Sequence, residues 1–293
     1  MKGIDVSTLQ GVIDWGKVAD SGVKFAMIKA TQGRGEGAAT RLLRRFTDSR
    51  FKRNIEAASD AGIACGVYHY MTAKTEYEAI EEAEYFCSVI KPYRDRIALW
   101  AAVDVESEMH LTGIGHYELA SIVEQFMLTV KKRGFKPMLY TNPNYLKYRL
   151  PDGAFDRADI WLAHYNVAKP MEVPNTQMWQ KGTDRVPGVP GVCDVNEGYF
   201  SEAIPAISRL AALGVIDTPA FWYEHYQEPK YLDELLIKSA DKITVAGEAY
   251  SDLSIALDRL NSVGIVNTPA YWIANAPKYE HVTELICKIG GCV

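Results

Sequence analysis

Two acidic residues stand at the end of an apolar segment. The segment ALWAAVDVESE covers residues 98–108 and carries Asp104 and Glu106. Side chains alternate across a strand, so both carboxylates face one side, which is the interior of a barrel if Val103 and Val105 pack outward. Burial and mutual repulsion would raise one pKa, and a protonated acid beside an ionised partner suits glycoside hydrolysis. The alternative is that both residues have left the strand for a solvated loop.

Two further acids are candidates to join this pair. Asp5 ends an apolar run at the start of the chain, and Asp194 follows the segment VPGVC at residues 189–193. Taken alone, each could instead cap a turn or a helix. Convergence of four carboxylates from three distant parts of the chain would favour a catalytic site.

Aromatic residues lie near the ends of the predicted strands. Sugars present apolar faces ringed by hydroxyl groups, so a groove lined by Tyr and Trp side chains matches them. The alternative is that these rings pack in the core of a barrel. The candidate residues are Tyr68, Tyr70, Tyr140, Trp161, Tyr165 and Trp179.

The first two thirds of the chain alternate short apolar runs with stretches of helical period, which favours a mainly parallel sheet. Residues 75–90 and 117–133 repeat their apolar positions every three or four residues, as on a helix with one buried face. Enough strands are present for a closed or nearly closed α/β barrel, irregular because its later connections are short and rich in Pro and Gly. Function in such a barrel lies at the carboxyl ends of the strands. The predicted strands are residues 3–6, 25–30, 64–70, 99–105, 137–141, 160–165 and 176–180.

After about residue 200 the pattern changes to helices without strands, and the segment repeats itself. RLAALGVIDTPAFW at residues 209–222 aligns without gaps onto RLNSVGIVNTPAYW at residues 259–272. Each copy is predicted to hold a helix ended by glycine, a turn at Thr-Pro, an aromatic pair and a second amphipathic helix. The predicted domains are a barrel at 1–200 and an all-helical domain at 201–293, with repeats at 201–240 and 251–290.

Composition narrows the class of protein. The chain has 293 residues, with 32 basic and 37 acidic side chains and a formal charge of -5. Because no long basic block is present, nucleic-acid binding is not expected. No segment approaches the ~18 apolar residues of a membrane span and the first residues lack a secretory signal, so we expect synthesis in the cytoplasm. Five cysteines form no metal-binding spacing, so we expect reduced thiols and predict no metal or cofactor.

Several short blocks of residues follow one another in a fixed order. The blocks are Asp5-Val6-Ser7, Gln10-Gly11, Ile13-Asp14-Trp15, Ile28-Lys29-Ala30-Thr31, Gly66-Val67-Tyr68-His69-Tyr70, Val103-Asp104-Val105-Glu106, Tyr140-Thr141-Asn142, Trp161-Leu162-Ala163-His164-Tyr165, Gln177-Met178-Trp179-Gln180 and Asp194-Val195-Asn196. Taken in order, they resemble the family 25 glycoside hydrolases, the Chalaropsis-type lysozymes common among bacteriophage endolysins. The resemblance covers about residues 1–200, and the ordered set is far more specific than any one block.

The resemblance implies an N-acetylmuramidase with an irregular β/α barrel, which cuts the β-1,4 bond between N-acetylmuramic acid and N-acetylglucosamine in peptidoglycan. Glu106 matches the general acid, and Asp104 matches the partner thought to position or polarise the substrate N-acetyl group. Asp5 and Asp194 complete an acidic floor. The residues predicted to bind substrate are Tyr68, Tyr70, Tyr140, Trp161, Tyr165, Trp179, Lys29 and Gln32, although many relatives have an acid in place of Gln32.

The duplicated region looks like modules at the ends of other phage-associated wall hydrolases. Two weak sites on one chain gain avidity on a repetitive polymer, so residues 201–293 are predicted to bind the cell wall. Either the aromatic residues contact the ligand, or the Trp of each copy is the core of a small helical unit. The aromatic candidates are Trp222, Tyr223, Tyr226, Tyr271 and Trp272.

The whole chain is therefore predicted to be a phage or prophage endolysin, which reaches peptidoglycan after lysis or pore formation. Two alternatives stay open. One is a chitinase-like glycosidase, because such enzymes also carry an Asp-x-Glu strand end. The other is an inactive barrel retained for glycan binding, with the repeats supplying most of the affinity.

Overall fold

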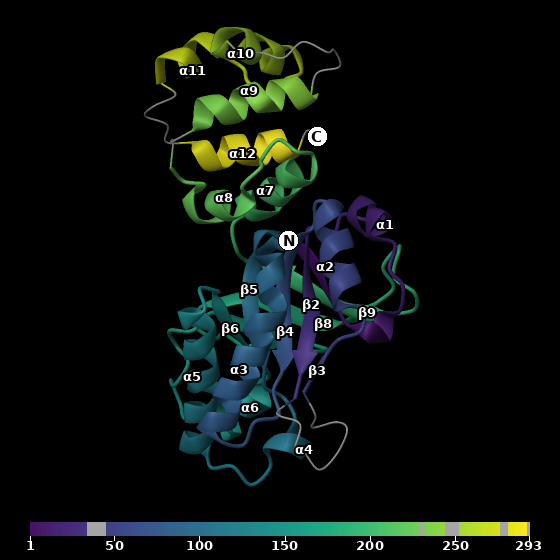
Figure 1. Cartoon of the computed structure of the whole chain (residues 1–293), viewed down its shortest axis with the longest axis vertical. Helices are drawn as coiled ribbons and strands as arrows, with labels where there is room; N and C mark the ends of the chain where they lie inside the picture. Colours follow the sequence, from purple (N-terminus) through teal and green to yellow (C-terminus); the bar gives the residue numbers. More distant parts are fainter. Residues whose placement is uncertain (34–44, 229–230, 244–251, 276–280, 292–293) are drawn as a thin grey trace.

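A computed structural model describes residues 1–33, 45–228, 231–243, 252–275 and 281–291, and shows a strand-rich barrel joined to a block of helices (Figure 1). The strands in these ranges are β1 (Lys2–Val6), β2 (Phe25–Gln32), β3 (Phe46–Thr47), β4 (Ala64–Tyr70), β5 (Ile97–Asp104), β6 (Pro137–Thr141), β7 (Ile160–Ala163), β8 (Thr176–Asp184) and β9 (Cys193–Gly198). The helices beside them are α1 (Trp15–Asp20), α2 (Phe51–Asp60), α3 (Glu76–Ile90), α4 (Glu108–Leu111), α5 (His116–Lys132) and α6 (Pro143–Tyr148), with short 3₁₀ helices at Thr8–Gln10 and Lys91–Arg96.

Eight of the described strands close into a barrel in the order β1-β9-β8-β7-β6-β5-β4-β2, because β1 also pairs with β2. Neighbouring strands are parallel except at β9, which runs antiparallel to both β8 and β1. The short strand β3 extends β2 outside the ring. The predicted closed and irregular α/β barrel is confirmed, and each of the seven predicted strands is present.

Two strands, β3 and β9, were not predicted from the sequence. β3 has only two residues, which is too short for a periodic pattern. β9 has the sequence CDVNEG, in which polar side chains alternate with small or apolar ones instead of forming an apolar run. β9 nevertheless completes the ring, so Asp194 and Asn196 become part of the barrel interior, while Glu197 faces outward and pairs with Lys181.

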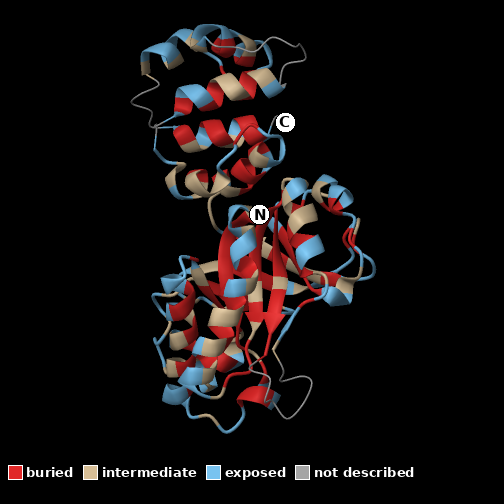
Figure 2. Ribbon diagram, in the orientation of Figure 1, coloured by how far each residue is buried: buried red, intermediate tan, exposed pale blue. Residues whose placement is uncertain are grey.

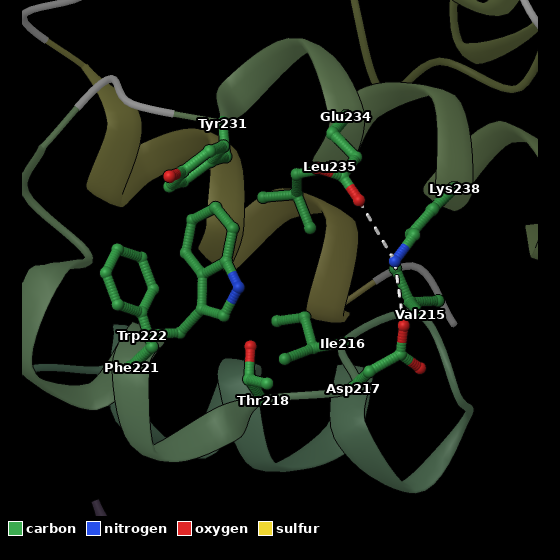
Figure 3. A pocket seen from close by; sticks show the side chains of 10 residues that line it. All are labelled: Val215, Ile216, Asp217, Thr218, Phe221, Trp222, Tyr231, Glu234, Leu235 and Lys238. Atoms are coloured by element: carbon green, nitrogen blue, oxygen red, sulfur yellow. Dashed lines mark hydrogen bonds and ion pairs between the residues drawn. The ribbon is translucent and has the colours of Figure 1, made fainter.

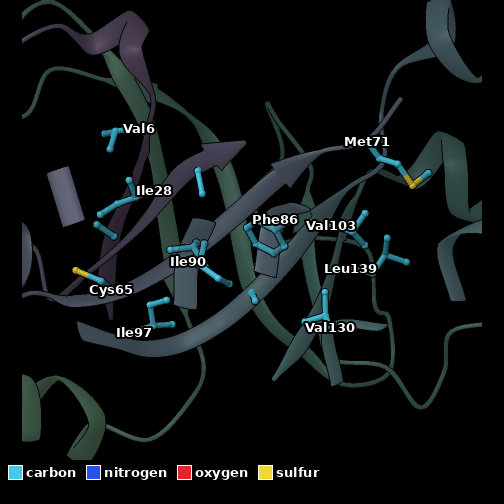
Figure 4. Packing of buried hydrophobic residues seen from close by; sticks show 14 of the residues in the cluster. Val6, Ile28, Cys65, Met71, Phe86, Ile90, Ile97, Val103, Val130 and Leu139 are labelled. Carbon is cyan, nitrogen blue, oxygen red and sulfur yellow. The ribbon is translucent and has the colours of Figure 1, made fainter. Parts of the chain in front are cut away.

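Helices α2, α3 and α5 cover the outer face of the barrel, and buried apolar side chains fill the space between them and the strands (Figures 1, 2 and 4). α3 begins where the Thr75 hydroxyl oxygen accepts a hydrogen bond from the Glu78 backbone N–H. Val103 and Val105 belong to this outer core, as the alternation of side chains predicted. Asp104 between them therefore faces the barrel interior.

A buried polar network joins the end of β4 to α3. His69 Nε2 lies 2.9 Å from Glu82 Oε2, and His69 Nδ1 lies 2.7 Å from Thr31 Oγ1. Glu82 also accepts hydrogen bonds from the backbone N–H and the hydroxyl of Thr72. Because a buried polar group without a partner is costly, this network fixes the end of β4, the strand that carries two of the predicted aromatic site residues.

The described residues after β9 form only helices, namely α7 (Ala203–Ala212), α8 (Pro219–His225), α9 (Leu232–Ile243), α10 (Leu253–Ser262), α11 (Pro269–Asn275) and α12 (Val282–Gly291). The two sequence copies interlock, because α7 packs against α12 and α9 packs against α10. Their buried side chains form one hydrophobic cluster, so neither copy has a core of its own. Across the described ranges, no helix is long and apolar enough to cross a membrane.

The helical block lies against the amino-terminal end of the barrel (Figure 1). The Phe200 ring makes edge contacts with Phe25 and Trp100, at centroid distances of 5.2 and 5.3 Å. Tyr223 of α8 packs against the side chains that fill the barrel, and its hydroxyl lies 3.0 Å from Ser208 Oγ. The block therefore covers the end of the barrel opposite to the carboxyl ends of its parallel strands.

Gly290 lets α12 approach α7 closely. A Cβ atom at this position would lie 2.8 Å from the Ala206 Cβ atom and 2.9 Å from the Ala206 carbonyl oxygen, both too short for a real contact. A Cβ atom on the neighbouring Gly291 would meet nothing within 4 Å. The contact between the two sequence copies therefore depends on a missing side chain at one position.

We expect Gly290→Ala to lower the free energy of unfolding by about 1–3 kcal/mol, because α7 and α12 must move apart. The matched control is Gly291→Ala, which adds the same methyl group into open space and should change stability little. Urea unfolding followed by circular dichroism measures both. Equal unfolding free energies for the two variants would contradict this account of the helix contact.

Candidate active site

The structure brings the four acids predicted to be catalytic to one end of the barrel. Asp5 lies near the end of β1, Asp104 is the last residue of β5, and Glu106 follows two residues later. Because β9 is antiparallel to β1, Asp194 near its start pairs directly with Asp5. The unpredicted strand thus delivers one acid to the carboxyl end of the barrel, where β/α barrels carry their function.

Asp5 is the acid that receives most hydrogen bonds. Its Oδ2 atom accepts from Gln180 Nε2 and from Asn196 Nδ2, each at 2.8 Å, and the residue is only 6% exposed. Burial and the negative charge of Asp194 raise the pKa of Asp5 to about 7. The Asp5 carboxyl therefore gains or loses its proton near neutral pH, although its Oδ2 atom accepts two hydrogen bonds.

Asp104 and Glu106 form the pair that the sequence singled out. Asp104 is 6% exposed, and its Oδ1 atom has no hydrogen-bond partner within the described part of the chain. Burial and the charge of Glu106 raise the pKa of Asp104 well above its usual value, and burial also raises the pKa of Glu106. Glu106 Oε2 accepts a hydrogen bond from the Tyr140 hydroxyl at 3.1 Å. The site therefore holds one partly accessible acid beside a buried one.

Lys29 is a cation that lies close to the acids. Its Nζ atom donates to Gln32 Oε1 at 2.7 Å and lies 5.0 Å from the centre of the Tyr70 ring. Burial lowers the pKa of Lys29, and its charge favours the ionised forms of Asp104 and Glu106. In the described residues, no group of three His, Cys, Asp or Glu side chains is placed to hold a metal ion.

The predicted tyrosines surround the acids. The Tyr140 hydroxyl lies 2.9 Å from Gln180 Oε1 as well as close to Glu106, so its single proton has two acceptors. Tyr165 donates to the same oxygen of Gln180 and is 45% exposed, which places its ring at the rim. Tyr68 and Tyr70 are half-buried on β4. Tyr68, Tyr70 and Tyr165 provide hydroxyl groups and the partly open rings that a sugar site needs. Tyr140 is only 4% exposed, so the prediction that its ring binds sugar is corrected, and Tyr140 contributes its hydroxyl to the acid cluster.

The two tryptophans predicted to bind sugar are both buried. Trp161 is 1% exposed inside the barrel, with its ring centre 4.5 Å from that of Tyr140, and its Nε1 donates to Asn196 Oδ1 at 2.8 Å. Trp179 is 6% exposed, alternates with Gln180 along β8, and donates to the His164 carbonyl oxygen at 2.8 Å. The prediction that these rings bind sugar directly is corrected, because packing leaves neither ring with an open face.

Gln180 and Asn196 are site residues that the sequence prediction missed. Together they connect Asp5 to Tyr140, Tyr165 and the buried Trp161. Strand alternation was the available signal. Gln180 stands two residues after the interior Met178, and Asn196 stands two residues after Asp194.

The raised pKa of Asp5 predicts a pH-dependent stability. Because the folded state holds this proton more tightly than the unfolded chain, the stability it contributes is full below about pH 4 and is lost as the pH rises through about 7. Asp5→Asn removes the titration, so we expect the variant to gain about 2–4 kcal/mol over the native chain between about pH 4 and 8. Urea unfolding across this range measures the difference. A difference that stays constant with pH would contradict the assignment.

The chain is similar in sequence and in structure to known proteins of one family. The sequence model of the glycosyl hydrolases family 25 matches residues 4–189. The chain is 31% identical over 205 residues to the autolytic lysozyme of Clostridium acetobutylicum, and the match covers 70% of this chain and 57% of that protein.

Two solved structures agree with this match. The bacterial lysozyme from Streptomyces coelicolor has a TM-score of 0.59 at 28% sequence identity, with 71% of this chain and 96% of that chain covered. The autolysin LytC from Streptococcus pneumoniae, in complex with a synthetic peptidoglycan ligand, has a TM-score of 0.57 at 26% identity. That match covers 67% of this chain and 46% of LytC, so the chain spans about half the length of that relative. The four clustered acids, the irregular barrel and the sequence match together show that the chain belongs to glycosyl hydrolase family 25.

Proposed function

We propose that the barrel is a lysozyme that cuts the β-1,4 bond between N-acetylmuramic acid and N-acetylglucosamine in peptidoglycan. The observation that carries the proposal is the pair of Asp104 and Glu106, two neighbouring acids whose pKa values are both raised. Membership of family 25 and the lysozyme names of its relatives support the substrate class. The peptidoglycan ligand in the LytC complex supports it further.

Glu106 is proposed as the general acid. Its pKa is raised by burial, so more of it keeps a proton near neutral pH. The proton moves to the glycosidic oxygen as the bond from that oxygen to the sugar C1 breaks. Tyr140, which hydrogen-bonds the Glu106 carboxyl, holds the acid in place during this step.

Asp104 is proposed to act on the acetamido group of the sugar. Its buried Oδ1 atom lacks a partner in the described part of the chain and is suited to accept the N–H of that group. This contact would direct the acetamido carbonyl oxygen at C1, so that a bond forms there as the glycosidic bond breaks. The ionised Glu106 then takes a proton from a water molecule, and the water oxygen attacks C1. The bond from C1 to the acetamido oxygen breaks in this step, which restores the acetamido carbonyl and leaves a new reducing end.

The test is to digest purified peptidoglycan, reduce the new ends with borohydride and identify them by mass spectrometry. We expect reduced N-acetylmuramic acid. Glu106→Gln should lower the rate by about 10²–10⁴-fold, the usual contribution of a general acid. The matched control is Glu108→Gln, an exposed acid two residues away whose side chain pairs with Arg149 outside the acid cluster, and this variant should stay active.

Other outcomes would reject parts of the proposal. Reduced N-acetylglucosamine would mean that the opposite bond is cut, as a chitinase-like enzyme would do. No new ends on several walls would favour a glycan-binding barrel without activity. Equal rates for Glu106→Gln and the native chain would remove Glu106 from the acid role.

We also propose that the helical block retains the enzyme on the cell wall. The duplication supports this proposal, because two equivalent sites on one chain gain avidity on a repetitive polymer. Its location supports it too. The block covers the amino-terminal end of the barrel, and so leaves the end with the acids open to substrate.

Removing the helical block should weaken retention on the cell wall without abolishing cleavage of glycan chains. A chain ending at Ser201 loses Tyr223 and its neighbours from the barrel end, so we expect a lower melting temperature together with continued cleavage of soluble glycan chains. In a Glu106→Gln background, which keeps the walls intact, we expect at least about tenfold weaker sedimentation with purified walls. Unchanged sedimentation relative to full-length Glu106→Gln would reject retention by the block.

A further inference from the structure

A cavity of about 460 Å³ lies within the helical block (Figure 3). It is bounded by the turn between α7 and α8, by α8 itself and by α9. Trp222 and Leu235 line its apolar side, and Asp217, Glu234 and Lys238 line its polar side. A cavity of this size with a few polar groups on an apolar wall suits a small ligand or one unit of a polymer.

The polar side offers hydrogen-bonding groups that a ligand can reach. Lys238 Nζ lies 2.8 Å from Asp217 Oδ2 and 3.2 Å from Glu234 Oε1. All three side chains are substantially exposed, and the hydroxyl group of Thr218 lines the same cavity. The edge therefore presents one ammonium donor between two carboxylate acceptors, an arrangement that can bind neighbouring hydroxyl groups.

Aromatic rings form the opposite side. Phe221 and Tyr231 meet edge to face with centroids 5.8 Å apart, and Tyr231 is 45% exposed. The Trp222 ring beside them is only 8% exposed and belongs to the buried core of the block, as one of the two sequence alternatives expected. Phe221 and Tyr231 therefore supply the open part of an aromatic wall that faces the polar edge (Figure 3). An aromatic wall opposite paired donors and acceptors is the general chemistry of sugar recognition.

The internal duplication keeps several residue types of the cavity lining. Asp233 corresponds to Thr283 and Glu224 to Ala274, so exposed positions outside the cavity have changed. The cavity positions pair as Thr218 with Thr268, Phe221 with Tyr271, Trp222 with Trp272, Glu234 with Glu284, Leu235 with Leu285 and Lys238 with Lys288. Tyr231 corresponds to His281, so one ring of the wall is an imidazole in the second copy. An exposed i,i+4 ion pair stabilises a helix by only about 0.3–0.5 kcal/mol, which is a weak reason to keep both partners in both copies.

One difference between the copies indicates the charge of the ligand. Asp217 corresponds to Asn267, so the polar edge carries a net negative charge in the first copy and none in the second. Both side chains accept hydrogen bonds through an oxygen, but only Asp217 attracts a cation. A ligand that both copies recognise is therefore neutral and is held by hydrogen bonds.

We propose that each sequence copy binds one neutral N-acetylated hexosamine of a glycan strand, in the cavity beside Trp222 and at the matching position beside Trp272. The sugar face stacks on the aromatic wall, its hydroxyl groups bond to the Glu and Lys side chains, and its acetamido methyl group enters the apolar end near Leu235 or Leu285. This proposal rests on the wall retention proposed above and names its sites and ligand.

The test uses the full-length Glu106→Gln chain labelled with ¹⁵N, and N-acetylglucosamine tetramer as the probe. The indole N–H signals of Trp222 and Trp272 are assigned from single Trp→Phe variants and followed by NMR during titration. Both signals should shift. Lys238→Gln should weaken binding about tenfold at Trp222 alone, the effect of losing a hydrogen bond to a charged group, and Lys288→Gln should do so at Trp272 alone.

Two controls sharpen the result. Lys242→Gln lies one turn further along α9 and outside the cavity lining, so it should leave both titrations unchanged. Glucose tetramer lacks acetamido groups and should bind at least about tenfold more weakly if the methyl group is buried. The proposal would be overturned if the Trp222 and Trp272 signals did not shift. It would also be overturned if the affinities read from these shifts were the same in both Lys variants as in the parent chain. Retention on walls and cleavage by the native chain are scored separately, so either can stand when these sites fail.

Discussion

Burial of carboxylates at one end of the barrel is the constraint on which the rest of the site depends. Removing a carboxylate from water costs several kcal/mol unless other groups replace its hydration. The chain supplies amide donors to Asp5, a hydroxyl to Glu106 and the charge of Lys29 near Asp104. The compensation is incomplete, because the pKa values of these acids remain raised. The same incomplete compensation is what equips an acid to hold and release a proton near neutral pH.

The antiparallel strand β9 explains how such a site is assembled. In a fully parallel ring, the start of a strand lies at the amino-terminal end, away from the site. Reversal of β9 puts Asp194 at the carboxyl end, where it pairs with Asp5, and Asn196, which lies opposite Gly3, donates a hydrogen bond to Asp5. Asn196 in turn is fixed by the Trp161 indole. The departure from regular β/α order is therefore a structural requirement of the acid cluster.

Sequence alone predicted the parts of the fold that follow from strong periodicity. The apolar runs identified seven strands, and alternation around Val103 correctly turned Asp104 inward. β9 was missed because its inward residues are polar, and a polar strand resembles a loop until its partners are known. Trp179 was misassigned because residue type alone does not tell which face of β8 carries the ring. Gln180 was passed over as a site residue because its importance arises from contacts with residues far away in the chain.

The acids and the helical block occupy opposite ends of the barrel, which has a consequence for movement on the substrate (Figure 1). Under the proposed binding, the sugar units held by the block are not those lying across Asp104 and Glu106. The enzyme would then bind one stretch of peptidoglycan while it cuts another, and release of the product would not dissociate the enzyme from the wall. Each bound enzyme would therefore cut the glycan strands within its reach. It would not move processively along a single strand.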